Sequence, residues 1–227
     1  NFKAMKGQTI GVIGGTGSGK SSLVNLIPRL YDATQGEVLV DGVNVKDYDI
    51  EALRNKVGIV MQKAVLFKGT IRENMWMGKK GATDEQIDEA LEISQSKEFV
   101  DSKQGRLDYV IEQGGKNLSG GQRQRLTIAR AIVRKPDVLI LDDSASALDF
   151  ATDAALRKAI RGMNNSPTVF IVSQRAASLM YADLIIVLDD GQVAGMGTHD
   201  ELLANCEVYK EIYESQFKKA DSEGGVA

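Results

Sequence analysis

The chain has 227 residues, of which 43% are hydrophobic and 26% charged, and its formal net charge is −3. This composition is ordinary for a globular protein with a substantial core, and the slightly acidic balance argues against nucleic acid as a partner. A single cysteine, Cys206, excludes an internal disulfide framework. The sequence contains no run approaching the roughly 18 consecutive apolar residues of a membrane-spanning helix.

Apolar runs alternate with helical patterns along the chain, which predicts an α/β fold with a mostly parallel sheet flanked by helices. A short antiparallel pair is expected around the turn Asp41-Gly42, and a similar turn, Asp190-Gly191, precedes the last predicted strand. The predicted strands are, in chain order, 8–13, 37–40, the segment around Val45, 57–61, 138–141, 168–172, 184–188 and 192–196.

Helical patterns occupy most of the intervals between these strands. The first predicted helix follows a glycine-rich loop and runs to about Leu30, with Pro28 ending or kinking it. Strand patterns are absent from about 70–116, where apolar residues recur at helical spacing, so this stretch is expected to be a helical insertion. The polar, glycine-rich residues 218–227 predict a disordered tail.

A glycine-rich motif, GGTGSGKS, follows the first predicted strand and opens the first predicted helix. It satisfies G-x-x-x-x-G-K-[ST], a loop whose backbone amides cradle the phosphates of a nucleoside triphosphate. We expect Lys20 to reach the β- and γ-phosphates and the Ser21 hydroxyl to ligate Mg²⁺. The expected ATP-binding residues are Gly14, Gly15, Thr16, Gly17, Ser18, Gly19, Lys20, Ser21 and Ser22.

A second glycine motif, LSGGQ, precedes the helical run QRQRLTIARAIV. Ser119 is expected to cap this helix, with Gln122 three residues later completing a capping box. Gly120 and Gly121 carry no Cβ, so the phosphate of another molecule can approach the amides of the helix N-terminus. Two phosphate-binding ends on one chain suggest a nucleotide sandwiched between two copies of the fold.

A third motif, VLILDD, places Asp142 at the end of a predicted strand, where its carboxylate can hold Mg²⁺ through water. With the three motifs in this order, the chain strongly resembles the nucleotide-binding domain of an ABC transporter, from about Lys6 to about Gln216. The resemblance implies a P-loop ATPase with a RecA-like core, a small antiparallel β part and a helical signature-motif subdomain at about 70–135.

The same resemblance sets the expected domain, 1–217, and its cofactors, ATP and Mg²⁺. It also places the transmembrane domain, an N-terminal β part and the aromatic residue that stacks on adenine upstream of this chain, which opens as if cut from a longer protein. The Mg²⁺ ligands implied are Ser21, Gln62 and Asp142, and the D-loop residue is Asp149 in SALD.

Two catalytic positions depart from the pattern of the resembled family. Asp143 stands where the family normally carries the glutamate that polarises the attacking water, and Gln174 stands where it has a histidine that contacts the γ-phosphate. An aspartate side chain is one methylene shorter, and misplacement by about 1 Å can cost on the order of 10²-fold in rate. The expected catalytic residues, Asp143, Gln174 and Gln62, should therefore support binding better than hydrolysis, unless both departures are neutral variation.

The signature residues Ser119, Gly120, Gly121 and Gln122 are intact, so they can complete a competent site on a different partner. This asymmetry is typical of heterodimeric multidrug-type ABC exporters. The resemblance therefore implies a domain located at the cytoplasmic face of the cell membrane. Two alternatives remain open: a homodimeric exporter that hydrolyses ATP slowly, and a non-transport ABC protein in DNA repair or on the ribosome.

LFKGTIRENMWM at 66–77 resembles the exporter segment that receives the coupling helices of the transmembrane domain. Its large apolar residues either dock on that partner or fill the subdomain core. The resemblance also assigns such a contact to Glu112, with a solvated loop residue as the alternative. The docking candidates are Phe67, Met75, Trp76 and Met77, and Arg123, Arg130 and Arg134 are expected to form a solvated helix face.

Overall fold

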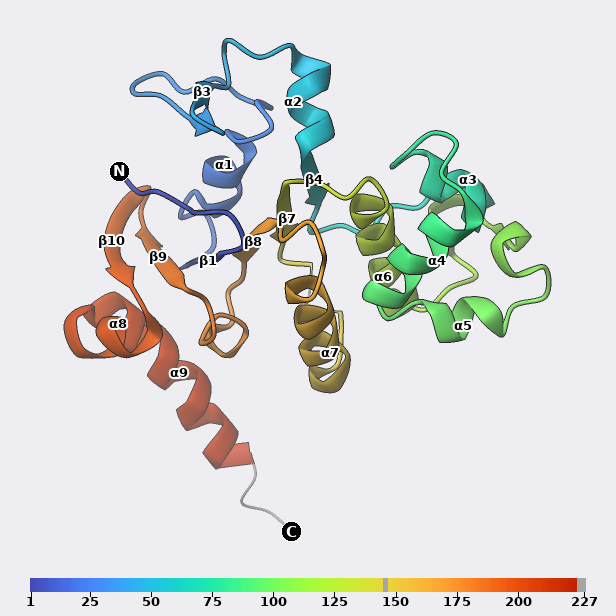
Figure 1. Cartoon of the computed structure of the whole chain (residues 1–227). Helices are drawn as coiled ribbons and strands as arrows, with labels where there is room; N and C mark the ends of the chain where they lie inside the picture. Colours follow the sequence, from blue (N-terminus) through green and yellow to red (C-terminus); the bar gives the residue numbers. More distant parts are fainter. Residues whose placement is uncertain (145–146, 224–227) are drawn as a thin grey trace. The chain divides into compact units, whose positions relative to one another are not determined.

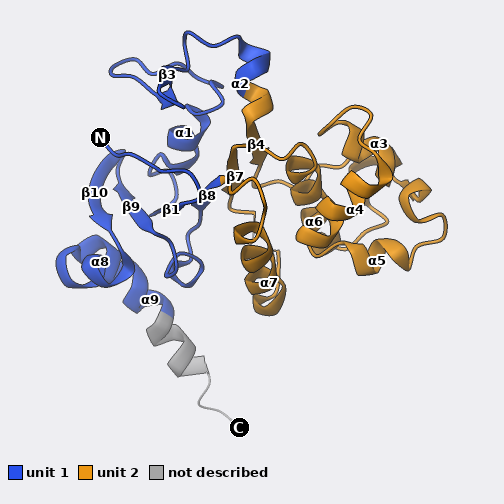
Figure 2. Cartoon of the chain, viewed as in Figure 1, with its two compact units in different colours: residues 1–53, 168–227 blue, residues 54–167 orange. Residues whose placement is uncertain are grey.

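The computed structural model describes residues 1–144 and 147–223, with side chains described as far as Gln216. The chain divides into two compact units (Figure 2): unit 1 comprises residues 1–53 and 168–227, and unit 2 comprises residues 54–167. The main sheet has six strands in the order β10-β9-β1-β8-β7-β4 (Figure 1), of which the first four belong to unit 1. The α/β fold predicted from the alternating patterns is confirmed.

Unit 1 is built around three parallel strands and one antiparallel edge strand. Strand β1 lies between its two parallel neighbours, β8 and β9, and every residue of β1 and β8 is buried. This burial explains why both strands read as continuous apolar runs rather than as alternating ones. The strands are β1 (Thr9–Gly14), β8 (Thr168–Val172), β9 (Leu184–Asp189) and β10 (Gln192–Gly197).

The predicted turns of unit 1 are present. Asp41 and Gly42 both have positive φ, 52° and 79°, as a two-residue type I′ hairpin requires, and Asp190-Gly191 repeats the pattern between β9 and β10. The remaining elements of unit 1 are α1 (Lys20–Asn25), β2 (Leu39–Val40), β3 (Val43–Asn44), the start of α2 (Ile50–Lys56), the 3₁₀ turn η3 (Ala176–Ser178), α8 (His199–Asn205) and α9 (Glu207–Glu223).

Unit 2 combines two strands of the main sheet with a group of helices. Strands β4 (Val57–Val60) and β7 (Val138–Asp142) pair in parallel with Val60 opposite Leu141. Helices α3, α4 and α5 lie together with α6 in Figure 1, in agreement with the predicted helical insertion. The helices are α3 (Ile71–Trp76), α4 (Asp84–Ile93), α5 (Lys97–Asp101), α6 (Gly120–Ile132) and α7 (Phe150–Arg161), with 3₁₀ turns η1 (Arg106–Asp108) and η2 (Gln113–Gly115).

Three details differ from the prediction. Helix α1 ends at Asn25 rather than near Leu30, because Pro28 disfavours helical backbone in the residue before it. Inside the insertion, β5 (Gly69–Thr70) pairs with β6 (Val110–Ile111), and two-residue strands are too short to give a sequence pattern. Helix α9 continues to Glu223, since 218–223 include the good helix formers lysine, alanine and glutamate; 224–227 lie outside the described residues.

Within the described part of the chain, no helix combines the length and the apolar character that crossing a membrane requires.

Candidate functional site

The glycine-rich loop of unit 1 connects the buried strand β1 to helix α1, as the motif requires. Gly14 ends the strand and Lys20 is the first residue of the helix, while Gly17 and Gly19 have φ of 82° and 92°. An L-amino acid with a side chain rarely adopts such values, so glycines at these two positions let the loop turn back over the helix N-terminus.

Lys20 is folded over this loop rather than extended into solvent. Its Nζ donates hydrogen bonds to the carbonyl oxygens of Gly14, at 2.9 Å, and Gly15, at 2.6 Å, and the residue is only 9% exposed. A buried ammonium held at the rim of a loop is a fixed positive charge close to the loop amides. This arrangement suits a polyanion such as a triphosphate.

Two further features of the loop suit the binding of phosphate groups. The Ser18 hydroxyl oxygen is buried and has no hydrogen-bond partner among the described residues. A Cβ built on Gly15 or Gly17 meets no heavy atom of the described chain within 4 Å, so the outer side of the loop is open to a ligand. Gly14, in contrast, lies against β9, where an added Cβ would be 2.1 Å from the Leu188 carbonyl oxygen.

Gln174 is brought next to this loop by strand pairing across more than 150 residues of sequence. Strands β1 and β8 run parallel with Val12 opposite Val172, and the Ser173 amide donates to the Val12 carbonyl at 3.1 Å. Gly14 and Gln174 each follow the paired residues Val12 and Val172 by two positions, so both lie at the same edge of unit 1. The Gln174 carbonyl accepts a hydrogen bond from the Gln216 Nε2 of α9 at 2.7 Å, which ties this loop to the C-terminal helix.

In unit 2, parallel pairing brings Gln62 and Asp143 together in the same way. They follow β4 and β7, each two residues beyond the matched pair Val60 and Leu141. The Gln62 Nε2 donates to the Asp143 Oδ2 at 3.0 Å, across 81 residues of sequence. Asp142 ends β7 as predicted and is only 4% exposed. Gln62 and Asp143 are thus in direct contact, and Asp142 is the residue before Asp143. Carboxylate and amide oxygens are ligand types that Mg²⁺ accepts.

The signature residues open helix α6 in the predicted geometry. Ser119 is the N-cap: its Oγ accepts from the Gln122 amide at 3.2 Å, and the Gln122 Oε1 accepts from the Ser119 amide at 3.0 Å. Gly120 is exposed, and a Cβ built there would meet only Arg123 Nη2, at 3.9 Å, among the described heavy atoms within 4 Å. The predicted capping box is confirmed, and the helix N-terminus is accessible from solvent.

The prediction of a solvated arginine face on α6 is wrong. Each of the three side chains donates to backbone carbonyls: Arg123 to Gly115 and Leu118, Arg130 to Val65, and Arg134 to Gly78 and Arg54, at distances of 2.6–3.3 Å. Burial lowers the pKa of both Arg130 and Arg134. These arginines tie α6 and the residues just after it to neighbouring segments of unit 2, which include the end of α2. Helical spacing alone does not reveal this tertiary role.

Asp149 is the N-cap of α7. Its carboxylate accepts from the Thr152 amide at 2.9 Å and from the Thr152 hydroxyl at 2.8 Å. The bond from the Thr152 amide lowers the pKa of the Asp149 carboxyl. The D-loop assignment of this residue stays a prediction, and Ser146, the first residue of SALD, lies outside the described residues.

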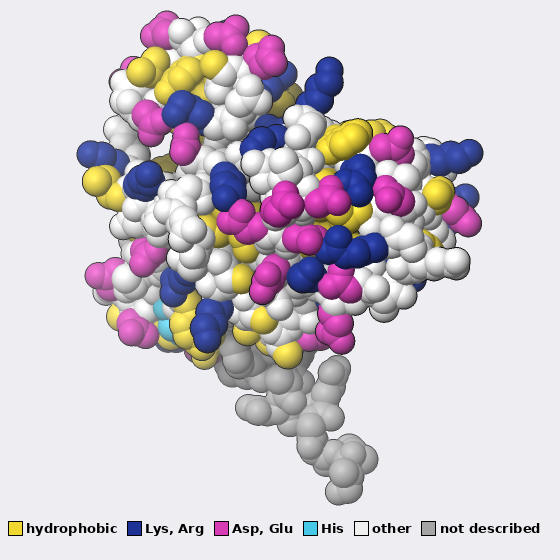
Figure 3. Space-filling view, turned by 45° about the vertical axis from the view of Figure 1, so that its right-hand side comes forward, with side chains coloured by type: hydrophobic (Ala, Val, Ile, Leu, Met, Phe, Trp, Pro, Cys, Tyr) yellow, Lys and Arg dark blue, Asp and Glu magenta, His cyan; other side chains and the backbone are white. Residues whose placement is uncertain are grey.

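The docking candidates divide between surface and core. Met75 is fully buried and belongs to the subdomain core, whereas Phe67, Trp76 and Met77 are 46%, 41% and 52% exposed. Trp76 is oriented by its indole Nε1, which donates to the Ala82 carbonyl at 3.0 Å. Glu112 is exposed, next to η2. Hydrophobic side chains also appear among interspersed acidic and basic ones in Figure 3.

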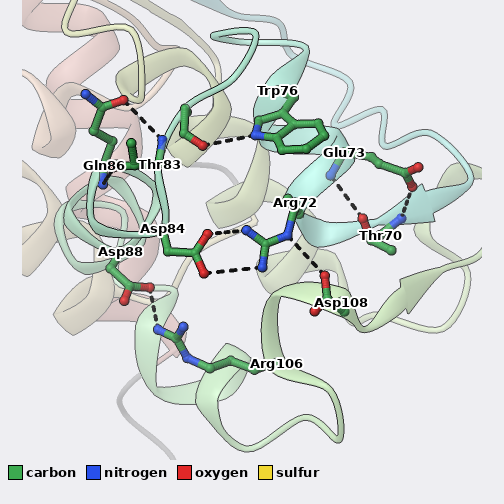
Figure 4. A network of polar contacts seen from close by, with 11 residues as sticks. Thr70, Arg72, Glu73, Trp76, Thr83, Asp84, Gln86, Asp88, Arg106 and Asp108 are labelled. Carbon is green, nitrogen blue, oxygen red and sulfur yellow. Dashed lines mark hydrogen bonds and ion pairs between the residues drawn. The ribbon is translucent and has the colours of Figure 1, made fainter.

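A polar network that the motifs did not indicate holds the helices around this segment (Figure 4). Arg72 of α3 pairs with Asp84 of α4 and donates to Asp108 of η1 at 3.1 Å, and Arg106 pairs with Asp88 of α4. The hydrogen bond with Asp84 raises the pKa of Arg72, and that with Arg72 lowers the pKa of Asp84. The only sequence signal for it was the local excess of opposite charges, which does not specify partners.

Comparison with known proteins places these motifs in a family. The family model described as ABC transporter matches residues 1–146. An uncharacterized ABC transporter ATP-binding protein, YfiB of Bacillus subtilis, is 45% identical over 98% of this chain. A putative multidrug export ATP-binding/permease protein of Staphylococcus aureus is 39% identical over 95% of it.

The chain spans about two fifths of the length of these relatives, 39% of the first and 37% of the second. Among solved structures, that of a bacterial Atm1-family ABC exporter with ATP bound resembles the chain with a TM-score of 0.90 and 32% sequence identity. That match covers 95% of this chain and 38% of the exporter chain.

Proposed function

The chain belongs to the ABC transporter family, and on this premise we propose that it is the ATP-binding, ATP-hydrolysing domain of an exporter. The observation that carries the nucleotide assignment is the loop at Gly14–Ser22, where Lys20 is buried over the loop carbonyls and the Ser18 hydroxyl has no partner among the described residues. The exporter assignment is supported by the names of the similar proteins and by the exposed apolar side chains of the docking segment.

In this proposal the loop amides and Lys20 bind the phosphates of ATP, and Ser21, Gln62 and Asp142 bind Mg²⁺. Bound Mg²⁺ would supply charge neutralisation at the phosphates. The buried carboxylate of Asp142 and the amide of Gln62 suit this role because both present oxygen ligands. Gln174 can donate an amide hydrogen bond to the γ-phosphate but cannot carry a positive charge.

We further infer that this chain's own ATP site is degenerate. Asp143 and Gln174 replace the family's glutamate and histidine, and both departures concern hydrolysis rather than binding. The intact residues Ser119, Gly120, Gly121 and Gln122, together with Asp149 of the D-loop, then complete the site of a second, consensus nucleotide-binding domain in a heterodimer. The supporting observation is that the N-terminus of α6 is capped and exposed.

The same proposal assigns Phe67, Trp76 and Met77, with Glu112, to the surface that meets the transmembrane domains. Met75 is excluded from this surface because it is buried. The assembled protein would act at the cytoplasmic face of the cell membrane. Three exposed apolar side chains near one another in sequence favour this reading over a purely internal role.

Titration with a fluorescent ATP analogue in the presence of Mg²⁺ tests nucleotide binding. Lys20→Ala should weaken binding by at least about tenfold, since a charge-assisted contact to phosphate contributes roughly 1.5–3 kcal/mol. Lys3, an exposed lysine outside the loop, provides the matched control Lys3→Ala, which should bind as the wild type does. Equal affinity of the Lys20 variant and the wild type would contradict the assignment.

A second measurement tests whether the chain's own ATP site is degenerate. If the chain's own site is degenerate, wild-type turnover should be very slow, and Asp143→Glu combined with Gln174→His should raise it when a homodimer forms. If both departures are instead neutral variation, the wild type should turn over at the rate of a consensus domain and the double variant should gain nothing.

A further inference from the structure

The hydrogen bond between Gln62 and Asp143 determines which way the glutamine amide faces. An ionised carboxylate only accepts hydrogen bonds, so the end of the amide directed at Asp143 must be the NH₂ group. In the structure, the Gln62 Nε2 donates to the Asp143 Oδ2 at 3.0 Å. The other end of the planar amide, Oε1, is therefore directed away from this carboxylate oxygen and can serve as a ligand.

The backbone of Asp143 favours aspartate for this contact. Its φ is 46°, in the left-handed region, which aspartate and asparagine adopt several-fold more readily than most other residues. The parallel register of β4 and β7 places the two residues level, so the short aspartate side chain reaches the glutamine amide. The hydrogen bond to this carboxylate orients the Gln62 amide.

We propose that Asp143 is a positioning residue for Gln62: its carboxylate fixes the amide so that Oε1, rather than the NH₂ group, is presented to Mg²⁺. This inference rests on the proposed function, in which Gln62 is a Mg²⁺ ligand. Groups that orient a metal ligand are worth about 10–100-fold in metal affinity, so the contact is expected to be measurable as Mg²⁺ affinity. The residue at the family's glutamate position thereby acts on metal binding in this chain.

The experiment is a double-mutant cycle read out by Mg²⁺-dependent binding of a fluorescent ATP analogue to the chain. Asp143→Gly removes the acceptor while suiting the positive φ, and Gln62→Ala removes the ligand. Each single variant should raise the Mg²⁺ concentration for half-maximal binding by about tenfold. The double variant should require no more than about twice the Mg²⁺ of Gln62→Ala, because the two residues act as one unit.

Two results would overturn the proposal. An unchanged Mg²⁺ midpoint in either single variant would remove the contact's role in metal binding. Additive effects, giving about a hundredfold shift in the double variant, would mean that Asp143 acts through its charge and independently of Gln62. Ser166→Gly is the control for the effect of placing a glycine at a position with positive φ. Ser166 is exposed, lies in the same unit and has φ of 45°, and this variant should leave the Mg²⁺ midpoint unchanged.

Failure of this inference is distinguishable from failure of the proposed function. Lys20→Ala tests nucleotide binding itself at saturating Mg²⁺, and its effect does not depend on how Gln62 is oriented. If Lys20→Ala weakens binding while the cycle is additive, only the positioning role is refuted. Thermal unfolding of each variant verifies that Asp143→Gly keeps the fold. If Asp143→Gly fails to fold, Asp143→Asn replaces it, because asparagine tolerates the same backbone conformation but cannot enforce one orientation of the Gln62 amide. Asp143→Asn is also expected to raise the Mg²⁺ midpoint.

Discussion

Replacing Gly120 with alanine should separate the stability of this chain from its function in an assembled transporter. A Cβ at Gly120 would be 3.9 Å from Arg123 Nη2, an ordinary van der Waals distance, so the chain itself has room for it. Gly120 is the first residue of α6, and alanine in place of a helical glycine contributes up to about 1 kcal/mol. The variant is therefore expected to be as stable as the wild type or slightly more stable.

Its effect on hydrolysis should have the opposite sign. In the proposed heterodimer the amides at the start of α6 approach the γ-phosphate bound to the partner, and an added methyl group would hold that phosphate away by about 1 Å. Misplacement of this size corresponds to on the order of 10²-fold in rate, or about 2.7 kcal/mol of barrier. The corresponding glycine in the partner's signature should be less sensitive, because it completes the degenerate site of Asp143.

The assay is steady-state ATPase activity of the two mutant heterodimers, with thermal unfolding of the isolated chain. Gly162→Ala is the matched control: this residue is the C-cap of α7, its φ is −80°, and an added Cβ would be 3.5 Å or more from its neighbours. It should change neither measurement appreciably. Equal losses in the two mutant heterodimers, or full activity of the Gly120 variant, would refute the division into one competent and one degenerate site.

Three further predictions concern stability. Gly14→Ala should lower the free energy of unfolding by about 2 kcal/mol or more, because the new Cβ would be 2.1 Å from a backbone oxygen. Gly15→Ala, where the new Cβ has open space, should leave this free energy unchanged, and denaturant unfolding of both variants measures the difference. Arg134→Ala should cost about 2 kcal/mol by leaving two backbone carbonyls without their charged donor, with exposed Lys158→Ala as the control in the same assay. The pKa of the Asp149 carboxyl is lowered by the Thr152 amide, so its ionised form stabilises the fold above the unfolded pKa of about 4, and this contribution is lost as pH falls through the folded value. The stability difference between wild type and Asp149→Asn should thus vanish at low pH, and a difference that persists there would contradict the role of the charge.

Local patterns were sufficient where the determining contacts lie within a few residues. The capping box of Ser119 and Gln122, the turn at Asp41-Gly42 and the loop before Lys20 are all closed by atoms that the sequence places next to one another. Their chemistry follows from residue type and spacing, because an N-cap hydroxyl or a glycine at positive φ has few alternatives. The buried strands were also predicted, since a continuous apolar run of strand length has few other uses.

Contacts between distant segments were not available from the pattern. Helical spacing placed Arg130 and Arg134 on one side of α6 but could not indicate that this side faces the backbone carbonyls of other segments. The exposure of Trp76 and the burial of Met75, its neighbour, likewise depend on how α3 packs within unit 2. Burial is a property of the assembled elements, so a short amphipathic stretch leaves it undetermined.

The sequence alone determined the glycine-rich loop before Lys20 and the capping box at the start of α6, because each is formed by residues that are close together in the chain. Only the tertiary structure decided that Asp143 accepts a hydrogen bond from Gln62, 81 residues away in sequence. The physical reason is the parallel register of β4 and β7, which brings the carboxyl ends of two distant strands level. Strand register depends on packing throughout the sheet, and residue identity at the two ends does not encode it.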